Sequence, residues 1–457
     1  MNKLDLYFAL PWWLQNLVIS IHGYKLKKER FNTLFDDISR FLLETDSWSK
    51  EEIKNYKEEQ LFKIIEHAYN HCPFYREKYK KARLSPKDFK GLEDLQKFPI
   101  LTKEEVRLNS NTMLADNIPR KGLIHGHTSG TTAMPLSFYF SPYNNAFYWA
   151  VCQRRLHRFG IHDNTKVINF AGKPVVPINQ KKSPYWRFDF VLNRYFLPMQ
   201  QLNRQKIPAI VQWLNKQKID VFVGYPSIVT SLANEILDSG EMLTYSPRHF
   251  FTSAEKIYPL QRTILQEVFP EIQIHEFYGF SEQVASATHC KFNHYHEDFE
   301  LGHLELNDSI AVENGTKGDI LATGFTNYAM PFIRYKNGDS AVFSQQTCSC
   351  GLHSQMIDSI EGRTEDYIVT PEGNHIQRLD YVFKNIPSLK ECQVIQKKNG
   401  EIIIRVVTRK GYSIKDEETL LKNVAQWISP TIQVQIEYVD TIPRTQSGKF
   451  RAVVSEL

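Results

Sequence analysis

The 457-residue sequence lacks any long uninterrupted apolar segment. The most apolar stretch near the start, residues 8–21, is interrupted by Pro11, Gln15 and Asn16 and is shorter than the roughly 20 residues that a membrane-spanning helix needs. It also lacks a basic leading region and a small-residue cleavage site, so it does not resemble a secretion signal. We therefore expect no transmembrane segment. We interpret residues 8–21 as an amphipathic helix that docks on the body of the protein, with a weak contact to a membrane interface as the alternative.

A strong excess of charge of either sign is also missing. The sequence has 56 Lys and Arg against 51 Asp and Glu, a formal net charge of +5, and its basic residues are spread along the chain. Nucleic-acid-binding domains usually concentrate basic residues on one face, so we expect no nucleic-acid partner. With 42% hydrophobic and 23% charged residues, the composition is that of an ordinary soluble protein of two or three domains.

Cysteine is scarce: the six are Cys72, Cys152, Cys290, Cys348, Cys350 and Cys392. A large chain without a secretion signal indicates a reducing compartment, and we expect a cytoplasmic protein without disulfides. In that setting clustered thiols more often bind a metal. Three of the six, Cys72, Cys152 and Cys392, have no partner at a suitable spacing, so we expect them in the core.

Hydrophobic periodicity predicts an α/β architecture. The first hundred residues are helix-rich, and Leu61, Ile64, Ile65, Ala68 and Tyr69 fall on one helical face. Further along, predicted strands alternate with predicted helices, a pattern typical of a parallel sheet. The strands are residues 166–170, 220–223, 249–252 and 272–277, and the helices are residues 227–239 and 260–269.

The pattern changes after about residue 363. Two β-rich runs within residues 394–407 flank Asn399-Gly400, a strong hairpin signal, and a helix at 416–428 and a strand at 432–439 follow. We predict a large N-terminal domain, residues 1–362, with parallel-rich sheets and helices, and a small α+β C-terminal domain, residues 363–457.

Residues 127–135, with the sequence HTSGTTAMP, form the most informative stretch. Hydroxyl side chains and exposed backbone N–H groups in a tight loop suit a polyphosphate, and Gly130 permits close approach of the backbone. Taken alone, such a turn is more often an ordinary loop.

Four further motifs follow in order: YGFSE at residues 278–282, YKNGD at 335–339, EGRTED at 361–366 and PRTQSGK at 443–449. The set resembles the adenylate-forming superfamily of acyl-CoA synthetases, peptide-synthetase adenylation domains and luciferases, over residues 60–451. Within it, the sequence is most similar to the phenylacetate–CoA ligase branch and its CapK-type proteins of polysaccharide biosynthesis. The signs are FPILTK at 98–103, GYPS at 224–227, TSAE at 252–255 and PFIRY at 331–335.

The resemblance implies a role for each motif residue. Lys449 would stabilise charge on the α-phosphate as the acid attacks, Glu282 would bind Mg²⁺, and Asp339 would bind the ribose hydroxyls. Arg363 would contact the ribose–phosphate region, Tyr278 and Ala254 would flank adenine, and Glu365 would be the hinge of a mobile C-terminal domain. The β- and γ-phosphates would be held by Thr128, Ser129, Gly130, Thr131 and Thr132, and the rest of the nucleotide site would include Glu255, Gly279 and Ser281.

The sequence departs from the family pattern in the phosphate loop. Many relatives carry Gly and then Lys or Arg before the loop proline, whereas Ala133 and Met134 stand here. A phosphate-contacting cation is therefore absent at that position, although the loop backbone can still bind phosphate. Taken singly, Lys449 could be a solvated tail residue, and Glu282 and Asp339 could be turn residues.

Cys348-Ser-Cys350 is a Cys-x-Cys pair, and Cys290 and His296 lie upstream, six residues apart. Together they make a Cys₃His set, the composition of a closed structural zinc site, and the phenylacetate–CoA ligase branch has similar pairs at both positions. Rival ligands are His289, His294 and His353. The alternative is reduced thiols in an apolar pocket.

We expect an ATP-dependent ligase that converts a small carboxylic acid to an acyl-adenylate and passes the acyl group to coenzyme A. A first alternative acceptor is an amino group, such as that of an amino sugar. A second alternative is a catalytically silent scaffold held together by zinc.

Overall fold

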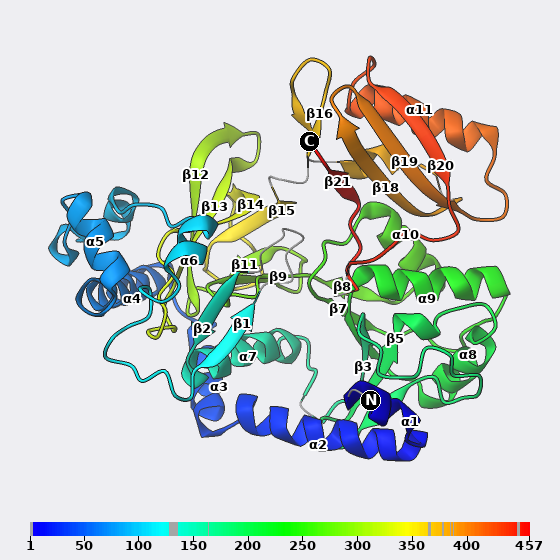
Figure 1. Ribbon diagram of the computed structural model, residues 1–457, viewed down its shortest axis with the longest axis horizontal. Coiled ribbons are helices and arrows are strands. Elements are labelled where there is room, and N and C mark those ends of the chain that lie inside the picture. The colour runs from blue at the N-terminus through cyan, green and yellow to red at the C-terminus, as the bar shows by residue number, and fades with distance from the viewer. Residues whose placement is uncertain are drawn as a thin grey trace. The chain divides into compact units, whose positions relative to one another are not determined.

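The computed structural model describes residues 3–457 except 128–135, 163, 364–366, 377–378, 384, 387 and 446–447. The chain divides into two compact units (Figure 1). The first consists of Met1–Tyr24, Asp163–Glu276 and Arg363–Leu457, and the second of Lys25–His162 and Phe277–Gly362. Most of the predicted phosphate loop, the hinge residue Glu365 and the side chain of Arg363 lie outside the described residues. The division into domains 1–362 and 363–457 stays a prediction.

The first unit contains a parallel-rich sheet with the strand order β4-β5-β3-β6-β7-β8. Every neighbouring pair is parallel except β4 and β5. The strands are β3 (Val167–Ala171), β4 (Arg187–Asp189), β5 (Arg194–Pro198), β6 (Val221–Gly224), β7 (His249–Thr252) and β8 (Gln273–His275), and the helices between them are α8 (Ile207–Gln217), α9 (Pro226–Ser239) and α10 (Pro259–Val268). The alternation predicted from the sequence is confirmed.

The predicted boundaries of α9 follow from local chemistry. Its first turn contains Pro226, whose fixed φ suits a helix start, and it ends at Gly240, whose φ of 73° caps the helix in the left-handed region. Ile228 and Leu232 are fully buried against the sheet. The helix follows β6, so its first turn lies at the carboxyl end of that strand.

The C-terminal part of the first unit has its own sheet, ordered β20-β19-β18-β21. The predicted hairpin is confirmed: β18 (Leu389–Lys398) and β19 (Glu401–Thr408) pair antiparallel, and Gly400 in the turn has a φ of 79°. Helix α11 (Ile414–Trp427) then leads to β20 (Gln433–Tyr438), and β21 (Val453–Ser455) lies beside β18. A short pair, β16 (Ile368–Val369) and β17 (His375–Ile376), precedes them.

The second unit is helical at its start and ends in an antiparallel sheet ordered β12-β13-β14-β15-β11-β10-β9. The helices are α3 (Thr33–Thr45), α4 (Lys50–His71), α5 (Pro73–Lys81), α6 (Lys103–Asn109) and α7 (Pro142–His157). The strands are β9 (Phe277–Gly279), β10 (Ser286–His289), β11 (Tyr295–Glu297), β12 (Gly302–Val312), β13 (Gly315–Gly324), β14 (Tyr335–Ser344) and β15 (Met356–Arg363), with a separate hairpin of β1 (Ile124–His127) and β2 (Ser137–Phe140). Most of the predicted apolar face of α4 is buried, with Leu61, Ile64, Ile65 and Ala68 all at 0% exposure, whereas Tyr69 is half-buried.

This antiparallel sheet is strongly curled. β9 and β14 are four strand positions apart, a distance of about 19 Å in a flat sheet. Yet the Tyr278 hydroxyl of β9 donates a 2.9 Å hydrogen bond to Asp339 of β14. A tyrosine side chain cannot cover the flat distance, so the sheet must bend until its two halves face one another.

One predicted strand is wrong as a single element. Residues 272–277 form β8 and the start of β9, which belong to two different sheets. The break falls at Glu276, where the chain passes from the first unit to the second. Continuous apolar character cannot reveal such a change of sheet, because both strands are partly buried.

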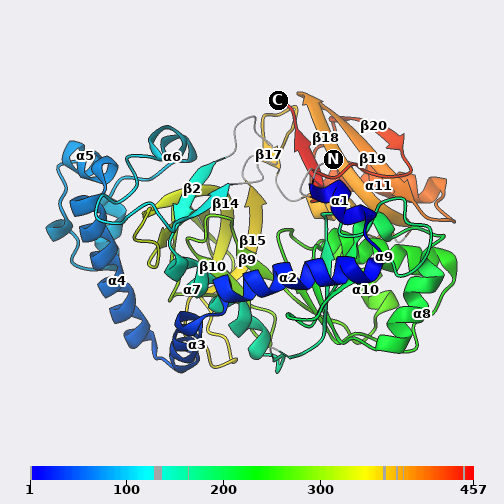
Figure 2. The same ribbon diagram turned by 60° about the horizontal axis from the view of Figure 1, so that its bottom comes forward.

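The predicted N-terminal helix docks on the body, but not through its apolar side chains. The segment forms α1 (Lys3–Ala9) and α2 (Trp12–Arg30), and the buried residues of α2 are Gln15, Asn16, Ser20 and Gly23. α2 lies at the front of the view in Figure 2. None of the described helices combines the length and the apolar character needed to cross a bilayer.

Candidate active site and metal cluster

The sheet of the first unit has a topological switch point between β3 and β6. The chain leaves β3 toward β5 on one side and later returns to β6 on the other. In open α/β sheets, ligands bind at the carboxyl ends of the strands at such a point. Here those ends are Phe170, paired with Gly224, and Thr252 on the neighbouring β7.

Lys449 is fixed beside this edge by the residues on each side of it. Gly448 packs directly on the backbone of Gly172, which follows β3, because a Cβ at Gly448 would lie 2.4 Å from the Gly172 Cα. Its φ of 82° is in the left-handed region, a second reason for glycine. On the other side the Phe450 N–H donates a 2.6 Å hydrogen bond to Glu255 Oε1. Lys449 is therefore held half-buried between two contacts to the sheet edge.

Glu255 links this segment to α9. Its carboxylate accepts hydrogen bonds from the backbone N–H and the hydroxyl of Ser227, both at 3.1 Å. Burial raises the pKa of Glu255, although the hydrogen bonds from Phe450 and Ser227 oppose this. The preceding Ala254 is exposed and has a φ of 60°, a strained conformation for a residue with a Cβ. The strain turns the chain sharply at the end of β7.

In the second unit, Tyr278, Asn337 and Asp339 form a closed triangle of hydrogen bonds. The Asn337 amide donates to the Tyr278 hydroxyl at 2.6 Å and to Asp339 Oδ2 at 2.9 Å, and Tyr278 donates to the same oxygen. The Asp339 N–H in turn donates to Asn337 Oδ1 at 3.0 Å. The triangle fixes the orientation of the Asp339 carboxylate before any ligand arrives.

Glu282 is buried next to this triangle. Its exposed fraction is 5%, and its Oε1 accepts a 2.7 Å hydrogen bond from the Tyr335 hydroxyl. Burial raises the pKa of Glu282, while the Tyr335 hydrogen bond and Lys103 lower it. The neighbouring Ser281 is exposed, and a Cβ at Gly279 would lie 2.7 Å from the Phe277 ring. A buried carboxylate beside a second one is a suitable oxygen ligand for Mg²⁺.

The four predicted metal ligands meet in the second unit. One ligand atom from each of Cys290, His296, Cys348 and Cys350 lies within 4.8 Å of all the others. The Cys290 and Cys348 sulfurs are 3.7 Å apart, and Cys350 Sγ is 3.4 Å from His296 Nε2. Two thiolates on a tetrahedral zinc are separated by about 3.8 Å, so the spacing fits that ion.

The surroundings of the cluster favour a metal-binding thiolate at Cys290. Burial opposes its charge, but hydrogen bonds from His296 and from the Phe292 and His294 backbone N–H groups lower the pKa of Cys290. Of the rival ligands, His294 comes nearest, with Nδ1 3.3 Å from Cys348 Sγ, and it is exposed. The described structure groups neither His289 nor His353 with the four ligands.

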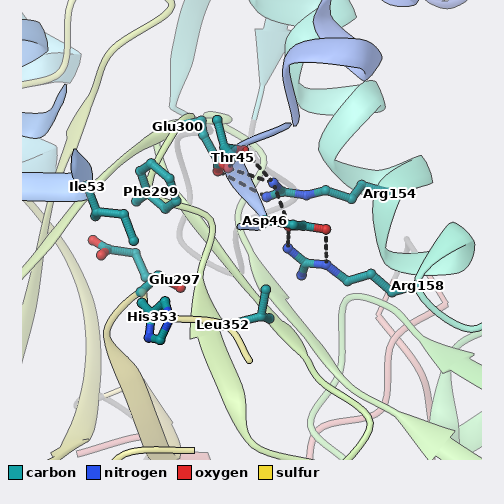
Figure 3. A pocket seen from close by; sticks show the side chains of 11 residues that line it. Thr45, Asp46, Ile53, Arg154, Arg158, Glu297, Phe299, Glu300, Leu352 and His353 are labelled. Carbon is teal, nitrogen blue, oxygen red and sulfur yellow. Dashed lines mark hydrogen bonds and ion pairs between the residues drawn. The ribbon is translucent and has the colours of Figure 1, made fainter. Parts of the chain in front are cut away.

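A buried ionic network lies beside the strand that carries His296. Arg154 of α7 donates to both Glu300 oxygens, at 2.6 and 3.0 Å (Figure 3). It also donates to Asp298 at 3.1 Å. Arg158 binds Asp46 at the end of α3. These contacts anchor the segment after β11 to helices α3 and α7. The small pocket that they line also touches Leu352 and His353, which follow Cys350 in the chain.

The sequence analysis gave no role to Tyr335, Asn337 or Phe450, and it named Ser227 only as part of the GYPS motif. Tyr335 and Asn337 lie inside the YKNGD motif, two residues apart on β14. The motif itself is therefore the signal that could have identified them. Ser227 and Phe450 act through the backbone and a small side chain, and their partner Glu255 is 28 and 195 residues away. Nothing local in the sequence indicates such pairs.

Comparison with known proteins agrees with this geometry. A family model described as the CapK C-terminal domain matches residues 368–456. Protein CapK of Staphylococcus aureus is 24% identical over 99% of both chains, and phenylacetate-coenzyme A ligase of Thermus thermophilus is 23% identical over 90% of this chain and 98% of that one. The chain is an adenylate-forming ligase.

Solved structures support the fold of this ligase. The structure of 2-hydroxyisobutyryl-CoA ligase in the postadenylation state, in complex with R3-HIB-AMP, superimposes with a TM-score of 0.71. The sequences are 18% identical, and the match covers 90% of this chain and 91% of that chain. The α/β architecture with its C-terminal domain, predicted from the sequence, is confirmed.

Proposed function

We propose that the ligase activates a small carboxylic acid with MgATP and transfers the acyl group to the thiol of coenzyme A. The observation that carries the proposal is the placement of Lys449. A lysine from the far end of the chain is held at the switch-point edge of a parallel sheet, where such sheets bind ligands, by Gly448 on Gly172 and by Phe450 on Glu255. A tail lysine without a function does not need two anchors.

In the first step a carboxylate oxygen bonds to the α-phosphorus of ATP, and the bond from that phosphorus to the bridging oxygen breaks. The products are the acyl-adenylate and pyrophosphate. Two anions must approach each other, so positive charge near the α-phosphate lowers the barrier. Lys449 supplies that charge in the proposal, and Thr128, Ser129, Gly130, Thr131 and Thr132 bind the leaving phosphates. Arg363 contacts the ribose–phosphate region.

Residues of the second unit hold the nucleotide and its metal ion. Asp339, oriented by Tyr278 and Asn337, accepts hydrogen bonds from the ribose hydroxyls. Glu282 would hold Mg²⁺, and when bound the ion would supply positive charge that offsets the charge of the pyrophosphate. A buried carboxylate with a raised pKa becomes fully anionic when a divalent cation is next to it, so metal and nucleotide binding reinforce each other.

In the second step a thiolate attacks the acyl carbonyl and AMP leaves with the bonding electron pair. Coenzyme A is the proposed acceptor because phenylacetate-coenzyme A ligase matches the chain and is named for it, and 2-hydroxyisobutyryl-CoA ligase has been solved with it bound. The match to CapK over 99% of both chains supports the alternative, transfer to the amino group of an amino sugar in polysaccharide synthesis. Both acceptors attack the same mixed anhydride, so the first step is common to them. We place the reaction in the reducing cytoplasm, where the thiol of coenzyme A stays free.

The four-ligand cluster is proposed as a structural zinc site. The three cysteines and one histidine would occupy every position of a tetrahedral ion and leave none for a substrate. When bound, the ion would link β10 and β11 to the segment after β14 and take no part in acyl transfer.

The decisive experiment is a panel of carboxylic acids assayed for pyrophosphate release with MgATP. We expect release that depends on one class of acid, followed by AMP release only when the correct acceptor is added. Coenzyme A and a nucleotide-linked amino sugar are compared in parallel. If no acid in a broad panel releases pyrophosphate above background, the chain is a silent scaffold and the proposal is wrong.

A further inference from the structure

The first 24 residues carry an unusual share of the exposed apolar surface. Of the 24 large hydrophobic side chains that are exposed among the described residues, eight lie between Leu4 and Tyr24. We call this the α1–α2 surface and define it by Leu4, Trp12, Trp13, Leu17, Ile21 and Tyr24. Exposed apolar side chains that cluster on a protein surface often mark an interaction site.

Four of the exposed apolar residues of α2 fall on one helical stripe. Trp13, Leu17, Ile21 and Tyr24 are separated by four, four and three residues, and their exposed fractions are 56%, 51%, 63% and 54%. Lys25 and Lys28 continue the same stripe at a spacing of four residues from Ile21 and Tyr24. The stripe thus changes from apolar to basic along the helix.

The opposite face of α2 is polar, and its contacts fix which side faces outward. Arg187 donates a 2.6 Å hydrogen bond to Gln15 Oε1, the Phe188 N–H donates to Asn16 Oδ1 at 3.1 Å, and the Phe190 N–H donates to Ser20 Oγ at 3.0 Å. Gly23 packs against Asp189, because a Cβ there would lie 2.0 Å from the Asp189 carboxylate. A rotation of the helix to bury the tryptophans would break all of these contacts.

The charged residues of α2 and of the loop near α1 indicate what covers the outward face of α2. Apart from Glu29, the charged residues of α2 are Lys25, Lys27, Lys28 and Arg30. Next to α1, the Tyr7 hydroxyl donates a 2.7 Å hydrogen bond to Val175 O, and the loop beyond Val175 exposes Ile178, Lys181 and Lys182. A second copy of this surface would offer these lysines no carboxylate except Glu29 and Asp5. An anionic lipid surface provides both an apolar layer and negative charge.

We propose that the α1–α2 surface binds the interface of an anionic membrane. Trp13, Leu17 and Ile21 enter the apolar layer, Tyr24 lies at the headgroups, and Lys25 and Lys28 contact lipid phosphates. The loop that bonds to Tyr7 begins at Gly172, which also contacts Gly448 beside Lys449. The bound surface and the lysine segment are therefore connected through one loop of the first unit.

The test is flotation of the full chain with vesicles of phosphatidylcholine that contain phosphatidylglycerol, compared with phosphatidylcholine alone. We expect binding to the anionic vesicles that weakens with added salt. The double substitution Trp13→Ser, Ile21→Ser should lower the bound fraction by about tenfold or more, and Lys25→Glu with Lys28→Glu should also lower it. All four side chains are exposed, so the folded chain should keep its melting temperature.

The controls use other exposed residues, which lie in the first unit and away from the α1–α2 surface. Met242→Ser with Ile414→Ser, and Lys410→Glu with Lys415→Glu, should leave vesicle binding unchanged. Two results would overturn the proposal. One is the absence of binding to anionic vesicles at low salt. The other is a concentration-dependent dimer, measured by light scattering, that disappears in Trp13→Ser, Ile21→Ser, because the surface would then join two copies. Neither result bears on acyl-adenylate formation, which is measured separately.

Discussion

At the residue scale, Lys449 is positioned by its neighbours. Gly448 can approach Gly172 because it has no Cβ, and Phe450 uses its backbone N–H to reach Glu255. Neither of these two contacts uses the side chain of Lys449, to which the proposal assigns a role in adenylation. This arrangement predicts different sensitivities for the two half-reactions.

Replacing Lys449 with Ala should lower acyl-adenylate formation by about 10²–10³-fold, because a charge that stabilises the transition state is lost. Thiol transfer from preformed acyl-adenylate should survive, since the lysine acts only on the first step. The measurement is ATP–pyrophosphate exchange alongside single-turnover transfer. Lys410→Ala, an exposed lysine in the same C-terminal segment, serves as control. Equal loss of both half-reactions would contradict the assigned role.

The pKa of Glu282 depends on its burial and on the hydroxyl of Tyr335. Its pKa is raised chiefly by burial, so the carboxylate takes up a proton at a higher pH than an exposed glutamate does. The Tyr335 hydroxyl opposes this by donating a 2.7 Å hydrogen bond to the charged form. If Glu282 must be ionised to bind Mg²⁺, the adenylation rate falls as pH drops through this raised pKa.

Tyr335→Phe removes the donor and should raise the pKa of Glu282 further. The acid limb of the adenylation pH profile should then move up by about one pH unit, and added Mg²⁺ should move it back down. The profile of kcat/KM against pH measures this shift. Tyr79→Phe is a matched control, because Tyr79 is equally buried and its hydroxyl has no partner among the described residues. If the acid limb of the pH profile does not move in Tyr335→Phe, or moves to lower pH, Glu282 is not the group whose titration sets that limb.

At the scale of elements, the Cys₃His cluster brings together segments that are far apart in the sequence. Cys290 and Cys348 are 58 residues apart, yet their sulfurs lie 3.7 Å from each other. His296 comes from β11, whose following segment is tied to α7 by Arg154. A metal ion at this point would hold the segments in register independently of the apolar core.

Cys348→Ser should reduce bound zinc from about one ion per chain and lower the melting temperature by about 4–8 °C, with a smaller effect on adenylation. Elemental analysis and thermal unfolding measure the two effects. Cys72→Ala is the control, because Cys72 is buried away from the cluster and burial raises the pKa of its thiol to about 12. Protein purified without chelator that holds no zinc would leave the four residues as ordinary thiols and a histidine.

At the scale of the whole molecule, the two half-reactions require the C-terminal domain to move, according to the family resemblance. Glu365, which lies outside the described residues, is the expected hinge, close to the start of the matched CapK C-terminal domain at residue 368. A few residues usually absorb the φ and ψ change of such a rotation.

Glu365→Pro should spare adenylation and impair acyl transfer at least about tenfold, because proline fixes φ near −65°. Comparing pyrophosphate release with AMP release in the presence of acceptor distinguishes the two steps. Glu372→Pro, in the turn between β16 and β17, tests whether any nearby proline has the same effect. Loss of adenylation with transfer intact would place the hinge elsewhere.

Short windows of the sequence encode the motifs and the local elements. The five motifs, the Cys348-Ser-Cys350 pair, the Asn399-Gly400 hairpin and the amphipathic α9 each lie within such a window, where turn residues and hydrophobic periodicity act directly. The antiparallel sheet, the Tyr278–Asp339 contact across its curl and the outward apolar face of α2 become visible only in the folded chain. These depend on partners that are distant in the chain: Gln15 and Arg187, 172 residues apart, reverse the orientation that the apolar residues of α2 predict. A hydrogen-bonded polar face can be buried as stably as an apolar one, and periodicity does not distinguish the two.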